Sequence, residues 1–471
     1  MLIPKILLDK NSSIPLYRQL TEALEGLIAD GTLAPDTKLP SIRKMAMASN
    51  VNNSTVVGAY KLLESRRAVY TVVGSGTFVA QPLADAAIPM PVVKPPMPEP
   101  LQLPDSTEGF INFADLTTDA DLFPSTAFRR AFDAALERDG GLAFGYCDSQ
   151  GYEPLRKSMC KLLDGYSVKA EKEHIQIIHG AQQGLDLLAA ALITPGDIVF
   201  IEALTSRAAA ASFMSKGAQI IEMPMVNDGP DMEAVETLFD RHKPKLIYVM
   251  PNFQAPTGIC YSDEKKRRLL SLAGACGAYI IEEDQFSDFY YDGVIRTPLK
   301  ALDTGNRIIF IKSFSKILMP GLHTSFMVCP PEVIETIDNK DIVMSGYVQR
   351  GFDLYLKSGA YNSYCATVRT TYGRRYQKIV AAVTTYLAPL ADCELPGGGL
   401  SLWITPHSDD AGLAESFLQN KVIVSPGRLY AAAGVDVKGF RLSFASVPES
   451  RIAEGIGAIA QVLNPEQNQD S

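Results

Sequence analysis

Eight prolines lie between residues 82 and 104, and they include the run PPMPEP at residues 95–100. Proline has no amide hydrogen and a fixed backbone angle, so a segment this rich in proline builds neither a helix nor a sheet ladder. It favours extended polyproline geometry instead. We therefore predict a semi-rigid linker over residues 81–109, which separates a small unit of residues 1–80 from a large unit of residues 110–465.

The composition is that of a packed globular protein, with 46% hydrophobic and 21% charged residues. No apolar run reaches the roughly 18 residues that a membrane-spanning helix requires, so no membrane partner is expected. The seven cysteines are scattered without a CxxC pair, which predicts reduced thiols and a cytoplasmic protein. The five histidines lack the spacing of metal ligands, so no metal site is expected.

Charge is distributed unevenly along the chain. Residues 1–80 hold nine Lys/Arg against six Asp/Glu, a balance of +3, whereas the whole chain carries −9. The remaining residues therefore carry −12. A basic head on an acidic body indicates a nucleic-acid-binding module joined to a unit with another task.

The small unit has the pattern of a winged helix-turn-helix. Apolar residues recur at helical spacing from Leu16 to Ile28, and Gly31 ends that run. Ser41 is expected to cap a short second helix, with Ile42, Met45 and Ala46 facing inward. A third helix, capped by Asn52 or Asn53, buries Val56, Ala59, Tyr60 and Leu63. The alternating segment TVVGSGTFV then predicts a β-hairpin.

Four segments carry a resemblance to a known domain: LYRQL, GTLAPDTKLPSIR, the V-x-x-S-T-V segment and GSGTFV. They resemble the GntR-type DNA-binding domain over its whole length. The resemblance implies phosphate contacts from Ser41 and Arg43, a recognition helix that starts at Ser54 and Thr55, and a wing around Gly76 that approaches the minor groove. Asn53 stands where family members usually carry an arginine, so base readout is expected to differ. A helix-turn-helix that serves only protein contacts is the alternative.

The large unit alternates short apolar strands with longer helical stretches, which predicts a mostly parallel α/β sheet. Expected strands are Ile175–Ile178, Ile198–Ile201, Leu246–Met250, Tyr279–Glu282 and Ile308–Lys312. Each ends in a polar or glycine-rich turn, where an open α/β sheet places its ligand site. The residues from Leu395 onward are expected to form a small α+β lobe.

Several motifs at these strand ends carry a second resemblance, and their order and spacing matter more than any one of them. They are LFP at 122–124, GYCDSQGYEPLR at 145–156, HGAQQGLDLL at 179–188, PGD at 195–197, PNFQAPTG at 251–258, SFSK at 313–316 and FRLSF at 440–444. They resemble the aminotransferase class I/II fold, a fold-type I pyridoxal-phosphate domain. Together with the GntR-like head, this is the architecture of the MocR family of bacterial regulators.

The resemblance implies a pyridoxal 5'-phosphate site. Lys316 stands where the family places the lysine that joins the cofactor covalently. The N–H groups of Gly180, Ala181 and Gln182 open a helix and are expected to hold the phosphate, with hydroxyl donors from Ser313 and Ser315. Arg441 matches the arginine that pairs bidentately with a substrate or effector carboxylate.

Five positions depart from the family pattern. Glu283 keeps the acid that meets the pyridine nitrogen, but Phe286 replaces a tyrosine three residues later. Ala255 replaces an asparagine, Leu204 a proline, Ser206 a ring-stacking aromatic residue, and His323 a phosphate-binding arginine. Asp284 is the reserve acid, but alternation along a strand turns it the other way. At about 1 kcal/mol for each lost neutral hydrogen bond, such changes weaken binding by orders of magnitude, so the cofactor is expected to bind loosely or not at all.

These features predict a homodimeric transcriptional regulator that binds a double-stranded DNA operator. Its aminotransferase-like body is expected to sense pyridoxal phosphate or an amino compound as a small-molecule effector, and efficient transamination is not expected. Two alternatives stay open. One is a working aminotransferase with a DNA-binding appendage, and the other is a regulator whose body is a cofactor-free dimeric scaffold.

Overall fold

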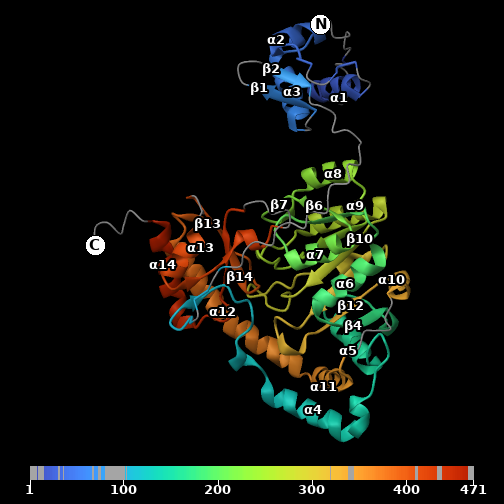
Figure 1. Ribbon diagram of the computed structural model, residues 1–471, viewed down its shortest axis with the longest axis vertical. Coiled ribbons are helices and arrows are strands. Elements are labelled where there is room, and N and C mark those ends of the chain that lie inside the picture. Colours follow the sequence, from blue (N-terminus) through green and yellow to red (C-terminus); the bar gives the residue numbers. More distant parts are fainter. Residues whose placement is uncertain are drawn as a thin grey trace. The chain divides into compact units, whose positions relative to one another are not determined.

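A computed structural model describes residues 8, 15–29, 32–34, 37–65, 68–72, 76–79, 101, 103–104, 106–318, 320–337, 344–408, 412–431 and 437–464. The chain forms two compact units, residues 1–91 and 92–471, and each is described by itself (Figure 1). Most of the predicted linker lies outside the described residues. No described helix is long and apolar enough to cross a membrane, and no group of three or more His, Cys, Asp or Glu side chains among these residues is arranged to hold a metal ion.

The N-terminal unit is a three-helix head with a hairpin. Its helices are α1 (Leu16–Ala29), α2 (Ile42–Ser49) and α3 (Asn53–Ser65). The predicted stripe of α3 is confirmed, because Val56, Ala59, Tyr60 and Leu63 are all buried. The prediction for Ile42 is wrong: this first residue of α2 is exposed, and only Met45 and Ala46 of the expected trio point inward.

The hairpin strands β1 (Val69–Val72) and β2 (Gly76–Val79) pair antiparallel, with Tyr70 opposite Phe78. The segment before α2 also joins β2, because Leu39 N donates to Thr77 O over 2.8 Å. Gly76 has a φ of +127°, a backbone conformation that L side chains rarely adopt, which favours glycine at the start of β2. Gly74 and Ser75 lie outside the described residues.

The C-terminal unit is built on a seven-stranded sheet in the order β4-β12-β11-β10-β9-β5-β6. The strands are β4 (Ile175–His179), β12 (Thr324–Val328), β11 (Ile308–Ser313), β10 (Tyr279–Asp284), β9 (Leu246–Val249), β5 (Ile198–Glu202) and β6 (Gln219–Met223). Only β12 runs antiparallel to its neighbours in this sheet. All five predicted strands are present, and their ends differ from the prediction by no more than two residues.

Helices cover the sheet and carry the chain from strand to strand. They are α4 (Ser125–Asp139), α5 (Glu153–Asp164), α6 (Gly180–Leu192), α7 (Arg207–Ser215), α8 (Met232–Arg241), α9 (Asp263–Cys276), α10 (Pro331–Thr336), α11 (Gly346–Lys357) and α12 (Ala360–Tyr386). One face of the central strands packs Ile309 and Ile311 with residues of α6 and α7. The other face packs Phe310 and Phe326 with α5, α11 and α12. The sheet is therefore buried on both sides, as in α/β proteins generally.

A smaller lobe follows the long helix α12 and lies beside the sheet, in orange and red in Figure 1. Its antiparallel sheet has the order β13-β14-β17-β16. The strands are β13 (Ala391–Glu394), β14 (Ser401–Pro406), β17 (Phe440–Ser443) and β16 (Ser425–Pro426), with helices α13 (Leu413–Gln419) and α14 (Ile452–Leu463). The short strands β3 (Ile111–Asn112) and β15 (Val422–Ile423) pair parallel and tie the start of this unit to the lobe.

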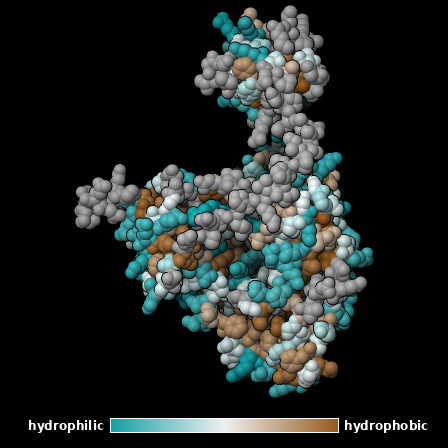
Figure 2. Space-filling model, in the orientation of Figure 1, coloured by the Kyte–Doolittle hydropathy of each residue, from teal (hydrophilic) through white to brown (hydrophobic). Residues whose placement is uncertain are grey.

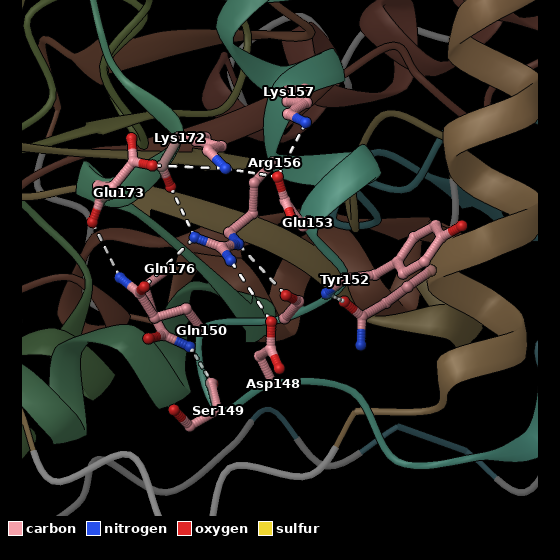
Figure 3. Close-up of polar contacts among 12 residues, drawn as sticks. Asp148, Ser149, Gln150, Tyr152, Glu153, Arg156, Lys157, Lys172, Glu173 and Gln176 are labelled. Carbon is pink, nitrogen blue, oxygen red and sulfur yellow. Dashed lines mark hydrogen bonds and ion pairs between the residues drawn. The ribbon is translucent and has the colours of Figure 1, made fainter.

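Arg156 in α5 anchors the loop that carries the GYCDSQGYEPLR motif (Figure 3). Its guanidinium donates to Gly151 O, to Gln150 Oε1 and to Lys172 O over 3.2, 3.2 and 2.9 Å. Gly151 has a φ of +100°, and a Cβ there would come within 2.5 Å of Ile177. The arginine and the glycine of this motif therefore fix the path of the loop.

Glu282 on β10 holds the 3₁₀ turn Leu299–Leu302, which precedes β11, from inside the core. Its carboxylate accepts from the backbone N–H groups of Leu299 and Lys300 over 2.7 and 2.6 Å. Burial raises the pKa of Glu282 to about 7 from 4.5, although both amides favour the ionised form. The carboxylate therefore ionises in the unfolded chain at a lower pH than in the folded protein.

We expect Glu282→Gln to remove part of the pH dependence of stability. Above pH 4.5 the unfolded glutamate loses its proton first, so the wild type loses stability as pH rises through about 7, by about 3 kcal/mol at most. Glutamine cannot titrate. The unfolding temperature of the variant relative to that of the wild type should therefore rise between pH 5 and 8. Thermal unfolding of the two proteins side by side measures this difference. A constant difference across that range would contradict this account.

Candidate cofactor site in the large unit

A cavity of about 280 Å³ opens at the carboxyl ends of the central parallel strands. The loops after β4, β5, β10 and β11 and the start of β12 all reach it. Its lining includes every residue that the sequence assigned to the cofactor: Gly180, Ala181, Gln182, Glu283, Ser313, Ser315, Lys316 and His323. Parallel strands end at the same edge of a sheet, which explains how motifs far apart in the chain meet there.

One end of the cavity is suited to a phosphate. Helix α6 begins at Gly180, so the N–H groups of its first turn have no helical acceptor and its dipole attracts an anion. The hydroxyl of Ser315 is buried and has no hydrogen-bond partner. A buried donor without an acceptor is costly, and a phosphate oxygen would satisfy it. The residues present therefore fit the phosphate of the cofactor.

Two histidines stand at this end of the cavity. The imidazole rings of His179 and His323 stack, with centroids 5.1 Å apart and planes 21° from parallel. Both side chains are exposed. A Cβ on Gly180 would lie 3.6 Å from His323 Nδ1, so His323 is next to the start of α6.

Lys316 lies in the turn after β11 and is exposed in the cavity. Ser313 ends that strand, and its hydroxyl accepts from the Ser325 hydroxyl over 3.0 Å and from Ser315 N over 3.3 Å. These contacts fix the SFSK turn on β11. The lysine side chain reaches the cavity from a rigid base.

Glu283 is a buried acid of the lining, on β10. Its Oε2 accepts from the Tyr248 hydroxyl over 2.5 Å, and its Oε1 accepts from Gln285 Nε2 over 2.5 Å. Burial raises the pKa of this carboxyl, while the two donors and the nearby Lys316 favour its ionised form. Each carboxylate oxygen accepts two hydrogen bonds, so Glu283 retains capacity for a protonated ring nitrogen.

Asp284 points to the other face of the sheet, as strand alternation predicts. Its Oδ2 lies 3.0 Å from Lys312 Nζ, and it does not line the cavity. Phe286 also lies outside the lining and packs in the core. Ser206 does line the cavity, but its hydroxyl accepts from Ala209 N at the start of α7. The ring end therefore lacks a phenol and an aromatic stacking partner among the described residues.

Arg441 lies apart from this lining, on β17 of the small lobe. It is buried, with its guanidinium 5.5 Å from the centroid of the Tyr430 ring. One Nη atom donates to Ala114 O over 2.5 Å, whereas the buried Nε has no partner. Burial lowers the pKa of this guanidinium. An unpaired buried N–H and a positive charge suit a carboxylate ligand.

The sequence did not single out several residues of this site, and three of them bear on its chemistry. They are His179, Gln285 and Tyr248, which reach the cavity or hold Glu283. His179 directly precedes the helix that was predicted to bind phosphate, so its position at the strand end was an available signal. Tyr248 gave none, because it looks like any buried residue of an apolar strand.

In the head, the residues assigned to DNA lie at the starts of α2, α3 and the wing. Ser41, Arg43, Asn53 and Ser54 are exposed, whereas Thr55 and Gly76 are partly buried. Ser41 has the extended backbone of an N-cap, but its side chain makes no capping hydrogen bond. Asn52 is the cap of α3, because its Oδ1 accepts from Thr55 N over 2.7 Å and from the Ser54 hydroxyl over 2.8 Å.

Comparisons with known proteins agree with both halves of this architecture. Residues 113–459 match the aminotransferase class I and II family, and residues 16–79 match the bacterial regulatory proteins of the gntR family. The fold of the large unit is that of a fold-type I pyridoxal-phosphate protein. The chain belongs to the aminotransferase class I and II family, and its GntR-type head gives it the two-part architecture of MocR-type regulators.

Relatives share the whole arrangement or the body alone. An uncharacterized HTH-type transcriptional regulator of Bacillus subtilis, YisV, is 27% identical over 96% of this chain and 97% of its own length. A probable rhizopine catabolism regulatory protein of Rhizobium meliloti, MocR, is 27% identical over 87% of this chain and 82% of its own. The kynurenine aminotransferase of Pyrococcus horikoshii, solved with PMP, is 28% identical with a TM-score of 0.72, over 76% of this chain and 91% of its own.

We expect Ser315→Ala to weaken binding of pyridoxal phosphate by about tenfold, because a hydroxyl donated to a charged group contributes roughly 1.5 kcal/mol or more. The same variant should bind pyridoxal, which has no phosphate, as the wild type does. A fluorescence titration with both compounds measures the two affinities.

Ser313→Ala is the matched control. It removes hydrogen bonds that exist without any ligand, so it should lower the unfolding temperature of the free protein, whereas Ser315→Ala should not. An equal loss of affinity for pyridoxal and pyridoxal phosphate in Ser315→Ala would show that this hydroxyl does not face the phosphate.

Proposed function

We propose that this protein is a DNA-binding transcriptional regulator whose aminotransferase-like body binds pyridoxal phosphate, or an amino compound acting through it, as a signal. The observation that carries the proposal is the meeting of eight predicted residues in one cavity, in a chain that also has a GntR-type head. Relatives of nearly full length named as HTH-type transcriptional regulators support it.

The cofactor, when bound, supplies an aldehyde that reacts with amines and a ring that withdraws electrons. The chain supplies the rest. We propose that the first turn of α6 and Ser315 bind the phosphate, that Lys316 presents the amine, and that Glu283 pairs with the ring nitrogen. Arg441 is proposed to bind the carboxylate of an amino-acid-like effector.

The altered ring end favours a sensor over a catalyst. Phe286 is buried in the core, and Ser206 uses its hydroxyl to cap α7. Contacts that hold a cofactor ring through many turnovers are therefore weaker than in the aminotransferases. A regulator needs only reversible binding that differs between two states of the protein.

We also propose a homodimer. Fold-type I proteins complete their sites at a dimer interface, and the segment between α4 and α5 carries an exposed apolar group that supports such a contact. Leu142, Phe144 and Tyr146 are 77%, 66% and 90% exposed. Figure 2 shows brown surface gathered at the lower end of the body, where Figure 1 places α4 and α11. Exposed apolar patches of this kind mark interaction surfaces.

A two-fold dimer favours a two-part operator with half-sites spaced by whole helical turns. Within each head, Arg43 at the start of α2 is proposed to contact a phosphate. Arg43→Ala should then weaken binding to every sequence and lower the slope of log affinity against log salt by about 1. Arg43→Lys keeps the charge and should keep the slope.

The measurement is a fluorescence-anisotropy titration, at several salt concentrations, of a duplex that the wild-type protein selects from a random pool. Wild-type affinity and slope in Arg43→Ala would remove this residue from the DNA interface.

The signal-binding role predicts attachment without turnover. Borohydride reduction in the presence of pyridoxal phosphate should attach the cofactor to Lys316, as located by peptide mass mapping, and should leave the Lys316→Ala protein unlabelled at the corresponding peptide. Incubation with amino-acid and keto-acid pairs should give turnover far below about 1 per second, the ordinary enzyme range. Turnover at that rate or faster would make the protein an aminotransferase with a DNA-binding appendage. Absence of labelling at Lys316 would favour a cofactor-free scaffold.

A further inference from the structure

A second cavity, of about 310 Å³, lies on the other face of the central sheet. It is enclosed by α5, the C-terminal end of α11, the start of α12 and the loop after β10. Its lining shares no residue with the cofactor cavity. A volume of this order lies at the lower end of the range for small-molecule sites.

The inner wall of this cavity is a buried, saturated polar cluster. Asp288 accepts from the Tyr166 hydroxyl at Oδ1, and at Oδ2 from the Tyr361 hydroxyl over 2.8 Å. Behind it, Lys312 Nζ lies 2.9 Å from Asp288 Oδ2 and 3.0 Å from Asp284 Oδ2. The carboxylate of Asp288 is therefore neutralised and hydrogen-bonded from within the protein, and it has little capacity for a cationic ligand.

The outer wall carries positive charge. Lys161 from α5, Lys357 from α11 and Arg369 from α12 line the cavity, whereas Asp288 is the single carboxylate residue of its lining. Lys357 is paired with Asp353 over 2.6 Å. Arg369 uses its Nε for Asp288 O and stacks 4.6 Å from the centroid of the Tyr290 ring, which leaves its terminal nitrogens for another acceptor. Among the described residues, neither Lys161 nor Arg369 has a carboxylate partner.

Apolar side chains fill the rest of the wall. Leu162, Leu356 and Cys365 line the floor, and the exposed Ile295 stands on the loop after β10. Two cations without a counter-ion beside an apolar wall match a ligand with one anionic group and a compact hydrocarbon body. Two lysine and arginine side chains that only solvate the surface would not need an apolar wall beside them.

We propose that this cavity is a second ligand site, separate from the cofactor cavity, which takes a small carboxylate with an apolar body. Lys161 and Arg369 bind the carboxylate, and the apolar wall holds the hydrocarbon. The site goes beyond the proposed regulatory function, since it depends on neither the cofactor nor DNA.

Calorimetric titration of the full chain with phenylacetate, 3-methylbutanoate and benzoate tests this site, with phenylacetamide as the uncharged counterpart of phenylacetate. At least one acid should bind saturably with a Kd in about the millimolar range or tighter. Phenylacetamide should bind at least about tenfold more weakly than phenylacetate, since loss of a charged pair costs 1.4 kcal/mol or more.

Lys161→Glu should weaken binding of the acid at least about fivefold, and Lys161→Arg should restore it. Lys157→Glu is the matched control, one turn earlier on the same helix and outside the cavity, and it should bind as the wild type does. Thermal unfolding of each variant checks that it is folded.

Arg441→Gln distinguishes this cavity from the proposed effector site at Arg441, which lines neither cavity. Binding that survives in Lys161→Glu but disappears in Arg441→Gln belongs to the proposed effector arginine and would overturn the second site. Equal affinity for phenylacetate and phenylacetamide, equal losses in the two charge reversals, or no saturable binding of any of the three acids would overturn it as well.

Discussion

The buried ammonium of Lys312 fixes the carboxyl ends of strands β10 and β11 relative to each other. It lies on β11 between Asp284 of β10 and Asp288 of the following loop, with no exposure to solvent. Although burial opposes it, these two carboxylates hold the pKa of Lys312 well above its ordinary value. Removing one partner of such a pair costs about 3–5 kcal/mol, because the remaining charge is left buried. The strand ends therefore have one stable arrangement.

Because side chains alternate along β10 and β11, the ion pairs on one face of the sheet also fix which residues face the cofactor cavity. Asp284 and Lys312 face one side of the sheet, so Glu283 and Ser313 must face the other. Glu283 meets Tyr248 and Gln285 there, and Ser313 fixes the turn that presents Lys316. The loop after β10 lines both cavities, through Gln285 in the cofactor cavity and through Ser287 and Asp288 in the second one. A ligand in either cavity therefore lies against the loop after β10, which also lines the other cavity.

The cofactor cavity keeps the helix start and the serine hydroxyl of its phosphate end, with His323 where the family pattern has an arginine, and it loses much of its ring end. The first turn of α6 and the unpartnered Ser315 hydroxyl remain suited to an anion. At the ring end, Phe286 has withdrawn into the core and Ser206 caps a helix. An enzyme under selection for turnover needs the contacts at the ring end as much as those at the phosphate end. Retention of the anchor alone is what a reversible sensor requires.

The sequence predicted the strands from local apolar patterns, and the resemblance to the aminotransferase family singled out the eight residues that the structure brings together in one cavity. It predicted the outward turn of Asp284 from alternation alone. It did not predict the role of Lys312, since a lysine next to the end of an apolar strand looks like a residue that reaches solvent. Its partner Asp288 comes from a loop, and Tyr361, which donates to Asp288, comes from a helix 73 residues further along the chain. Ile42 was assigned inward because helical spacing alone does not show which residues the first turn of a short helix leaves exposed.

The most direct test of the account is the affinity of the full chain for its selected operator duplex, measured with and without saturating pyridoxal phosphate in the wild type and in Lys316→Ala. A regulator that senses the cofactor binds it with different affinity in its two DNA-binding states, and linkage makes the effect reciprocal. The account predicts a change in wild-type operator affinity of about fivefold or more, in the usual range of such coupling, and no change in Lys316→Ala. Identical operator affinity with and without pyridoxal phosphate in the wild type, under conditions where Lys316 is fully labelled, would contradict it.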